Sequence, residues 1–398
     1  MSNTRNHVED LRGASRLAIE ATQGVTALVE EMHRTIVGGP DVLGRPLAGP
    51  AAMLLAPIYG GIRAVTKLIG HGIDGALGQL SAMLGERVPV VEHEALLAVL
   101  NGVLGDYLHE TGNPLAIKMR LRHGGKPLVL EHEALATALP DASRKLLVLV
   151  HGSCMGVLQW KRRGHDHGAA LARELGYTPV YLHYNSGLHV STNGESFAAL
   201  LEQLVAAWPS PIDELVILAH SMGGLVSRSA CHFGELAGHA WRRKLAKLVC
   251  LGTPHHGAPL ERGGNWIDVL LEVSRYSAPL ARLGRIRSAG VTDLRFGNVR
   301  HEDWEGRDRF AGGEDLRVLL PLPEGVACHA IAGVLKAEAS GKPETDGLVP
   351  TGSALGRGTT PERELGFAES AQWIAYETGH LDLLDSPQVY AKLEEWLR

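Results

Sequence analysis

The chain is poor in aromatic residues and carries no basic excess, and both shortages exclude nucleic-acid partners. Aromatic residues make up 5% of the 398 positions, too few for a surface on which bases stack. The formal net charge is -5, whereas binding to a phosphate backbone depends on basic side chains that release counterions. Because 45% of the residues are hydrophobic and 21% charged, the chain has the composition of a folded globular protein.

Cysteine is also scarce. The four thiols, Cys154, Cys231, Cys250 and Cys328, have no paired spacing, which excludes a disulfide framework and a zinc ribbon. Residues 1–16 are polar and charged and contain no apolar core of the kind a secretory signal needs. These features predict a reducing compartment, and we expect the protein to be cytoplasmic.

Motifs for nucleotides and metals are missing as well. No glycine-rich loop ends in Lys-Ser or Lys-Thr, and no GxGxxG follows an apolar run. Residues 164–168, GHDHG, together with His255 and His256 have metal-ligand side chains. However, there is no HExxH helix, and adjacent histidines rarely reach one ion with tetrahedral geometry. We therefore expect neither a cofactor nor a metal.

Residues 1–112 are predicted to form a helical region, because apolar residues recur at helical spacing from about residue 8 to residue 109. Its middle part, residues 53–84, is rich in Gly and Ala but contains too many polar side chains for a membrane span. Two interpretations stay open for this part. It is either a helical hairpin packed on the main domain or on another subunit of an oligomer, or an amphipathic surface that touches a membrane or a hydrophobic granule.

Residues 113–398 are predicted to form an α/β domain. A hairpin turn at residues 123–126 is followed by apolar strands that alternate with helices, which indicates a mostly parallel sheet with helices on both faces. The strands are expected at 145–150, 177–183, 214–219, 245–251, 326–333 and 371–375, and the helices at 168–175, 196–208 and 224–236. A block at about 258–323 interrupts the alternation, with a predicted helix around Trp266, and is a candidate lid.

The most informative segment is residues 215–224, LVILAHSMGG. An apolar strand runs into a serine flanked by small residues, and the sequence then continues as a helix, which is the pattern of a nucleophile elbow. Gly223 meets the requirement for a small residue two positions after Ser221, and Ala219 stands where glycine is usual two positions before it. The segment predicts Ser221 as a nucleophile, with His220 beside it in the site.

A serine nucleophile needs a base and a group that orients the base. On parallel sheets of this type the order along the chain is nucleophile, acid, histidine. Asp346 follows the predicted strand 326–333, and His380 follows the last one, so these two residues are the predicted acid and base. Three other carboxylates compete for the role of acid: Glu344, Asp382 and Asp385.

The oxyanion of the tetrahedral intermediate needs backbone N–H donors. One is expected from Met222, which follows the nucleophile. The second is expected from the loop after the strand 145–150, where Gly152 allows a sharp bend and Ser153 supplies the N–H, with Cys154 the next choice. His151, Gly152 and Cys154 are thus predicted to line the site. Cys154 as a second nucleophile would have no assignable base.

From about residue 146 onward the chain resembles the α/β-hydrolase superfamily, and within it the bacterial lipase/esterase branch. Four features carry the resemblance: HG after a strand, AHSMGG, LGTPHHG at 251–257, and DGLVP followed by GH. In lipase-like members the TPHHG segment lines the site entrance, which implies a lining role for His255. Relatives include inositol deacylases that act on glycolipids and intracellular polyester depolymerases.

The sequence thus predicts a serine hydrolase that cleaves carboxylic esters, a lipase or carboxylesterase, through an acyl-enzyme on Ser221. Alternatives with the same triad are an intracellular polyester depolymerase and an acyltransferase. An alternative of another class is a scaffold protein on membranes or granules, in which the hydrolase domain is secondary. The expected partner is an ester or lipid substrate.

Overall fold

A computed structural model of the chain describes residues 90–258, 288–309, 314–335 and 344–398. Val90–Tyr107 and Ile117–Arg398 form one compact unit, while residues 108–116 belong to a second unit. The predictions for residues 1–89, including the segment 53–84, and for the helix around Trp266 lie outside the described residues. The predicted division at residues 112 and 113 stays a prediction.

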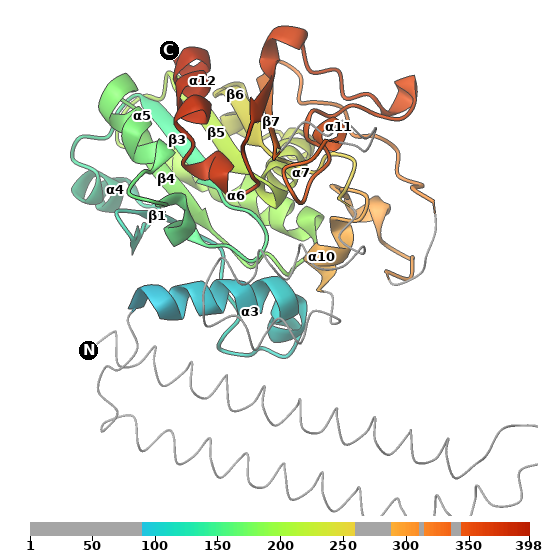
Figure 1. The fold of residues 1–398 in the computed structure, drawn as a ribbon. Helices are drawn as coiled ribbons and strands as arrows, with labels where there is room; N and C mark the ends of the chain where they lie inside the picture. The colour runs from blue at the N-terminus through green and yellow to red at the C-terminus, as the bar shows by residue number, and fades with distance from the viewer. Residues whose placement is uncertain (1–89, 259–287, 310–313, 336–343) are drawn as a thin grey trace, which may run out of the picture. The chain divides into compact units, whose positions relative to one another are not determined.

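The compact unit is built on an eight-stranded sheet with the strand order β2-β1-β4-β3-β5-β6-β7-β8 (Figure 1). Strands β3 to β8 pair in parallel, and β1 pairs antiparallel with both β2 and β4. The strands are β1 (Arg120–His123), β2 (Lys126–Pro127), β3 (Lys145–Val150), β4 (Thr178–His183), β5 (Glu214–His220), β6 (Leu245–Leu251), β7 (Ala327–Val334) and β8 (Gln372–Tyr376). The predicted hairpin and mostly parallel sheet are confirmed.

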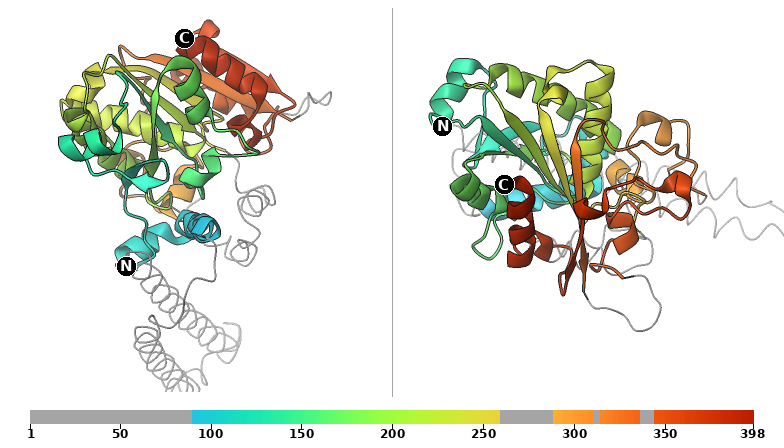
Figure 2. Two further views of the ribbon diagram at one scale, coloured as in Figure 1. Left: turned by 90° about the vertical axis from the view of Figure 1, so that its left-hand side faces the viewer. Right: turned by 90° about the horizontal axis from the view of Figure 1, so that it is seen from above.

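Helices cover both faces of the sheet, because alternate side chains of the buried strands point to opposite sides (Figure 2). Leu146 and Val148 of β3 pack in one core with α6 (Val190–Ala207) and α7 (Met222–Leu236). Leu147 and Leu149 pack in a second core with α5 (His167–Leu175) and α12 (Pro387–Leu397). The remaining described α-helices are α3 (Val90–Glu110), α4 (His132–Ala138), α10 (Ala289–Asp293) and α11 (Thr351–Ala354).

Helix α6 begins six residues before its predicted start, at Val190 instead of residue 196. Its first turns contain buried Ser191, Asn193 and Gly194, which are weak helix formers and gave no helical signal. A side chain at Gly194 would stand 2.1 Å from the Ser229 hydroxyl of α7. Packing between the two helices therefore selects a small residue there and overrides local propensity.

Within the interruption at 258–323, its first residue is bonded to a residue in the middle of the block. The Ala258 N–H donates to the carbonyl of Leu294 over 2.9 Å. The described part contains α10 and the short 3-10 helix His301–Asp303. Asp293, at the end of α10, accepts hydrogen bonds from the Val190 N–H and the Asn298 amide, which fix this segment on the start of α6. The role of the block as a lid stays a prediction.

Candidate active site

Ser221 stands at the turn between β5 and α7 in a strained backbone conformation. Its φ is 53° and its ψ is -126°, a combination that L-residues rarely adopt. Such strain costs on the order of 1–3 kcal/mol and persists only where the surrounding structure holds it. Here the Ser221 N–H donates to the carbonyl of Leu251 in the neighbouring strand over 2.8 Å. The arrangement is the elbow geometry that the segment 215–224 predicts.

The requirement for small residues at the elbow is unequal on its two sides. A side chain at Gly223 would approach the carbonyl oxygens of Val150 and His151 to 2.3 and 2.7 Å, so only glycine fits. Ala219, by contrast, is a fully buried residue of β5, and its methyl group belongs to the core. Alanine at 219 is therefore compatible with the turn.

Asp346 and His380 form a buried pair. The Nδ1–H of His380 donates to Oδ2 of Asp346 over 2.7 Å. The other carboxylate oxygen, Oδ1, accepts the N–H groups of Leu348 and Val349 over 2.9 and 2.8 Å. Because an ionised carboxylate only accepts hydrogen bonds, the proton of the neutral imidazole is placed on Nδ1 and the lone pair on Nε2. That is the tautomer in which an imidazole can take a proton from a hydroxyl.

Gly252 lies directly beneath this pair and was not singled out from the sequence. A Cβ at Gly252 would stand 3.1 Å from Asp346 Oδ2 and 3.2 Å from His380 Cε1, and the φ of the residue is +56°. Glycine is therefore needed both for the backbone conformation and for the space. In the sequence, Gly252 directly follows the strand β6, and nothing local distinguishes it from an ordinary turn glycine.

His220 connects the elbow to the loop that carries His380. Its Nε2–H donates to the carbonyl of His380 over 3.0 Å, and the two rings stand 4.7 Å apart. Burial lowers the pKa of His220 well below 6.5, and the neighbouring His380 lowers it further. His220 is therefore neutral at neutral pH and acts here as a hydrogen-bond donor.

The predicted oxyanion donors differ in whether they are already engaged. The N–H of Cys154 donates to the hydroxyl of Ser186 over 3.0 Å. The N–H groups of Ser153 and Met222 have no acceptor within the part of the chain that the structure describes. Met222 also begins α7, where the helix dipole favours negative charge. Ser153, and not Cys154, therefore has a backbone N–H that is available for the oxyanion.

The oxyanion loop is supported from within the core. A side chain at Gly152 would stand 3.0 Å from Ser221 Cβ, so the loop passes closely over the elbow. His151 stacks on Tyr184 with a ring separation of 4.3 Å, and the Tyr184 hydroxyl donates to the His151 carbonyl over 2.8 Å. Burial lowers the pKa of His151 to about 4, so this ring is neutral at neutral pH.

The three competing carboxylates have other partners. Asp382 accepts the Gly379 N–H and pairs with Arg163 at 3.0 Å, and Asp385 lies 3.7 Å from Arg162. The backbone carbonyl of Glu344 accepts the Thr351 N–H, and its side chain forms no hydrogen bond within the described residues. Among the described carboxylates, only Asp346 bonds the imidazole of His380.

Two further predicted site residues lie apart from the pair. The Nδ1 of His255 lies 3.4 Å from the Arg228 guanidinium, and its ring lies 5.3 Å from that of Phe367; no hydrogen bond joins it to Ser221, Asp346 or His380 among the described residues. Burial raises the pKa of the Cys154 thiol to about 12, so this cysteine is protonated. In the same part of the chain, no group of three or more His, Cys, Asp or Glu is arranged to hold a metal ion.

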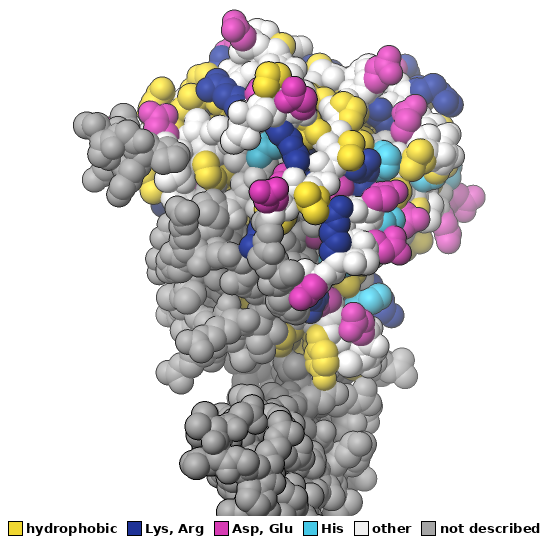
Figure 3. Space-filling view, turned by 90° about the vertical axis from the view of Figure 1, so that its right-hand side faces the viewer, with side chains coloured by type: hydrophobic (Ala, Val, Ile, Leu, Met, Phe, Trp, Pro, Cys, Tyr) yellow, Lys and Arg dark blue, Asp and Glu magenta, His cyan; other side chains and the backbone are white. Residues whose placement is uncertain are grey.

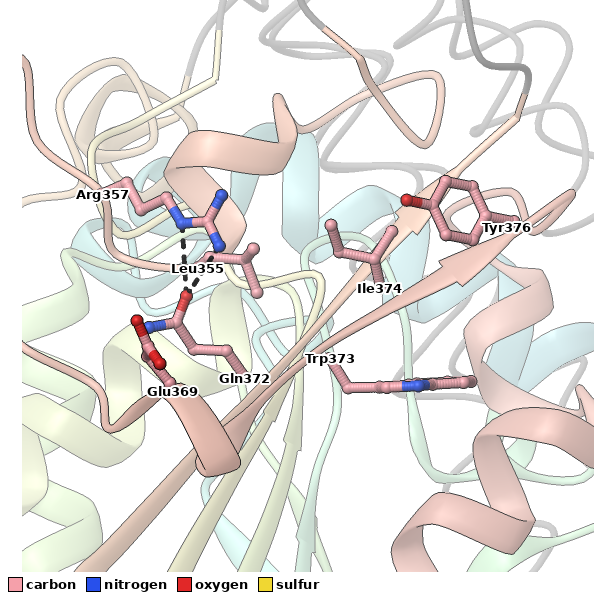
Figure 4. A pocket seen from close by; sticks show the side chains of 7 residues that line it. All are labelled: Leu355, Arg357, Glu369, Gln372, Trp373, Ile374 and Tyr376. Atoms are coloured by element: carbon pink, nitrogen blue, oxygen red, sulfur yellow. Dashed lines mark hydrogen bonds between the residues drawn. The ribbon is translucent and has the colours of Figure 1, made fainter.

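A surface pocket is lined by residues other than Asp346 and His380. It measures about 650 Å³ and lies along the edge strand β8, lined by Trp373, Ile374 and Tyr376 among others. Across it, the Arg357 guanidinium donates twice to the side-chain oxygen of Gln372 (Figure 4). On the face drawn in Figure 3, acidic and basic side chains are interspersed, with no field of one sign.

Part of the chain matches the model of a known protein family. Residues 143–314, which begin just before β3 and end within the interrupting block, match the family model of the PGAP1-like alpha/beta domain. The mostly parallel sheet with helices on both faces is the arrangement of the α/β-hydrolase fold. In this hydrolase fold, Ser221 and the oxyanion loop lie inside the matched stretch, and Asp346 and His380 follow it. No curated protein sequence matches the chain.

Several solved structures are similar to this chain. The lipase BlEst2 of Bacillus licheniformis in its mature form is 18% identical with a TM-score of 0.42, and the alignment covers 64% of this chain and 91% of that one. An esterase of Pyrococcus furiosus is 13% identical with a TM-score of 0.38, covering 65% and 82%. EstA from Clostridium botulinum is 12% identical with a TM-score of 0.37, covering 64% and 87%.

Proposed function

We propose that the protein is a serine hydrolase that cleaves carboxylic esters through an acyl-enzyme on Ser221. The observation that carries the proposal is the buried pair of Asp346 and His380, whose tautomer leaves the Nε2 lone pair free. It is supported by the strained elbow at Ser221 and by its neighbour His220, which bonds the His380 carbonyl. A hydroxyl becomes a useful nucleophile only when a base takes its proton, and this pair supplies an oriented base.

In the proposed reaction, the Oγ of Ser221 attacks the ester carbonyl while Nε2 of His380 takes the hydroxyl proton. The N–H groups of Ser153 and Met222 donate to the oxyanion that forms. Asp346 stabilises the imidazolium, whose second proton stays on Nδ1. As the tetrahedral intermediate collapses, the imidazolium gives its proton to the departing alkoxide. A water molecule then attacks the acyl carbonyl while Nε2 of His380 takes its proton. Collapse of the second tetrahedral intermediate releases the acid, and His380 returns the proton to the Oγ of Ser221.

Ester chemistry fits the residues better than chemistry that needs a metal or an activated thiol. The described residues hold no cluster of metal ligands, and the thiol next to the oxyanion loop is protonated. Within those residues no helix is long and apolar enough to cross a membrane.

The test is a series of p-nitrophenyl esters of graded acyl length, given to the wild type and to Ser221→Ala. We expect turnover by the wild type and at least a thousandfold loss in the variant, with an unchanged melting temperature. Retained turnover by Ser221→Ala would sink the assignment. The acyl length at which kcat/KM peaks separates a carboxylesterase from a lipase or a polyester depolymerase.

Acyl transfer uses the same triad and differs only in the acceptor. Adding a primary alcohol to the ester assay decides between the two activities. Hydrolysis predicts free acid as the main product at all alcohol concentrations up to about 1 M, at which water still exceeds the alcohol by about fiftyfold. A product that is mainly the new ester would identify an acyltransferase.

A further inference from the structure

The oxyanion loop is held by a turn that follows β4. The Ser186 hydroxyl of this turn accepts the N–H of Cys154 over 3.0 Å, and both side chains are buried. Cys154 has a φ of 58°, which is unfavourable for a residue with a side chain. Because peptide units are planar, fixing the Cys154 N–H fixes the Ser153–Cys154 peptide plane. Only the two dihedrals of Ser153 then separate that plane from the Ser153 N–H.

Helix α3 packs on this same loop and turn. A Cβ at Gly102 would stand 2.1 Å from the Sγ of Cys154 and 2.8 Å from its backbone nitrogen. Three residues along, the carbonyl of Gly105 accepts the side-chain amide of Asn185, next to Ser186, over 2.8 Å. The opposite contact is equally close, because a Cβ at Gly187 would stand 2.2 Å from the Asn101 carbonyl. Helix α3 thus contacts the residues on both sides of Ser186, through the Asn185 side chain on one side and the Gly187 backbone on the other.

Helix α3 is itself tied to the segment with α10, and the two lie side by side in Figure 1. The Ser288 hydroxyl donates to the Gly102 carbonyl over 2.7 Å, and the Ala289 N–H donates to the Asp106 carboxylate over 2.8 Å. The carboxylate of Asp106 also pairs with Arg309. Hydrogen bonds to Ser288 and Ala289 therefore help to hold Gly102 in its place against Cys154.

We propose that Ser186 and Gly102 are positioning residues for the oxyanion hole, and that α3 is a working part of the active site although it precedes the matched domain. Ser186 engages the Cys154 N–H and so leaves the N–H of Ser153 as the donor for the oxyanion. Gly102 allows α3 to cover Cys154 closely enough to maintain its strained conformation. This inference rests on the proposed function of Ser221.

The first test compares Ser186→Ala with wild type on a p-nitrophenyl ester and on a trifluoromethyl ketone with the same acyl chain. The ketone adds to the Ser221 hydroxyl: the Oγ–C bond forms, the C=O π bond becomes an alkoxide, and the proton passes to His380. Binding of the unreacted ester does not depend on the oxyanion hole, whereas the alkoxide of the ketone adduct is stabilised by it. We expect kcat to fall and the Ki of the ketone to rise by about tenfold or more, with KM within about twofold.

The control for the lost hydroxyl is Ser229→Ala, which removes a buried hydrogen bond to the Val299 carbonyl elsewhere in the fold. We expect it to keep kcat, KM and the Ki of the ketone. If Ser186→Ala does not fold, Ser186→Cys, whose sulfur is a weaker acceptor, is measured in its place, with the same direction of change and a smaller size.

The second test is Gly102→Ala, which adds one methyl group against Cys154. Alanine is a better helix former than glycine, so a loss of activity cannot come from a weaker helix. We expect the same pattern, a lower kcat and a higher Ki with an unchanged KM. The matched control is Gly352→Ala in α11, where a Cβ would come no closer than 4.0 Å to another atom.

Folded Ser186 and Gly102 variants with wild-type kcat and wild-type Ki for the ketone would overturn this inference, while Ser221-dependent turnover would leave the proposed function standing. Equal changes in kcat and in KM would also overturn it, because they indicate a general loss of structure. If wild-type turnover does not depend on Ser221, the proposed function fails and this inference fails with it.

Discussion

Asp346 and His380 are joined at two points. The imidazole Nδ1–H of His380 donates to the Asp346 carboxylate over 2.7 Å, and the backbone N–H of His380 donates to the Asp346 carbonyl over 2.9 Å. The backbone bond fixes where the histidine loop runs, and the side-chain bond fixes how the ring is turned. Orientation of the base is thus built into the contact between two loops that follow β7 and β8.

Replacing Asp346 by Asn should inactivate the enzyme without unfolding it. An amide at this position can donate to Nδ1 and so stabilises the wrong imidazole tautomer, for which we expect kcat to fall by about 10³- to 10⁴-fold. Steady-state kinetics with a p-nitrophenyl ester measure the effect. Glu344→Gln is the matched control, since its side chain bonds no other described residue, and it should keep kcat within about twofold. A large loss in the control and a small one in Asp346→Asn would reassign the acid.

The strain at Ser221 predicts a trade between activity and stability. Glycine adopts the observed φ and ψ without a steric penalty, so Ser221→Gly should abolish turnover and raise the free energy of unfolding by about 1 kcal/mol. Urea unfolding of both proteins measures the difference. Ser221→Ala keeps the Cβ and with it the strain, and should match the wild type. A Gly variant less stable than the Ala variant would show that the elbow is not strained.

His220 should act through the position of the His380 loop. Leucine at 220 removes the donor to the His380 carbonyl, and we expect kcat to fall roughly ten- to a hundredfold, because small misplacements of a base are costly. Glutamine can place a donor near the position of Nε2 and should recover part of the loss. The melting temperatures of the two variants separate the effect on the loop from a general loss of stability. An inactive Gln variant together with an active Leu variant would contradict this role.

Acid should destabilise the fold through buried neutral histidines. Burial lowers the pKa of His151 and of His167 to about 4, whereas an unfolded chain binds these protons near pH 6.5. Between these values the unfolded state binds more protons, so stability is fully present above pH 6.5 and is lost as the pH falls toward 4, by on the order of 3 kcal/mol for each histidine. Urea unfolding at several pH values measures the slope.

The matched pair for this slope is His167→Gln and His132→Gln. The first removes one buried histidine, whose Nε2–H donates to the Leu383 carbonyl, and should flatten the dependence of stability on pH between 4 and 6.5. The second replaces an exposed side chain and should leave the slope unchanged. Equal slopes in wild type and His167→Gln would show that this buried histidine does not cause the loss of stability in acid.

Much of this architecture could be predicted from local patterns. The apolar runs of β3 and β6 have the predicted ends, because strands buried on both faces are continuous in sequence. The order of Ser221, Asp346 and His380 along the chain predicted these three residues as nucleophile, acid and base. In the structure, Asp346 and His380 are in contact. What the sequence could not reveal depends on long-range packing: Gly252 beneath the pair, and Ser186 and Gly102 around Cys154, have no local signal that tells them from ordinary turn and helix residues.

The identity of Ser221 as the nucleophile is tested most directly by covalent trapping. A fluorophosphonate forms a bond to an activated serine oxygen with loss of fluoride, and peptide mass spectrometry locates the adduct. We expect one adduct, on the peptide that contains Ser221, formed slowly or not at all in Asp346→Asn. Labelling of another residue, or labelling of Ser221 at the same rate in wild type and Asp346→Asn, would contradict this assignment.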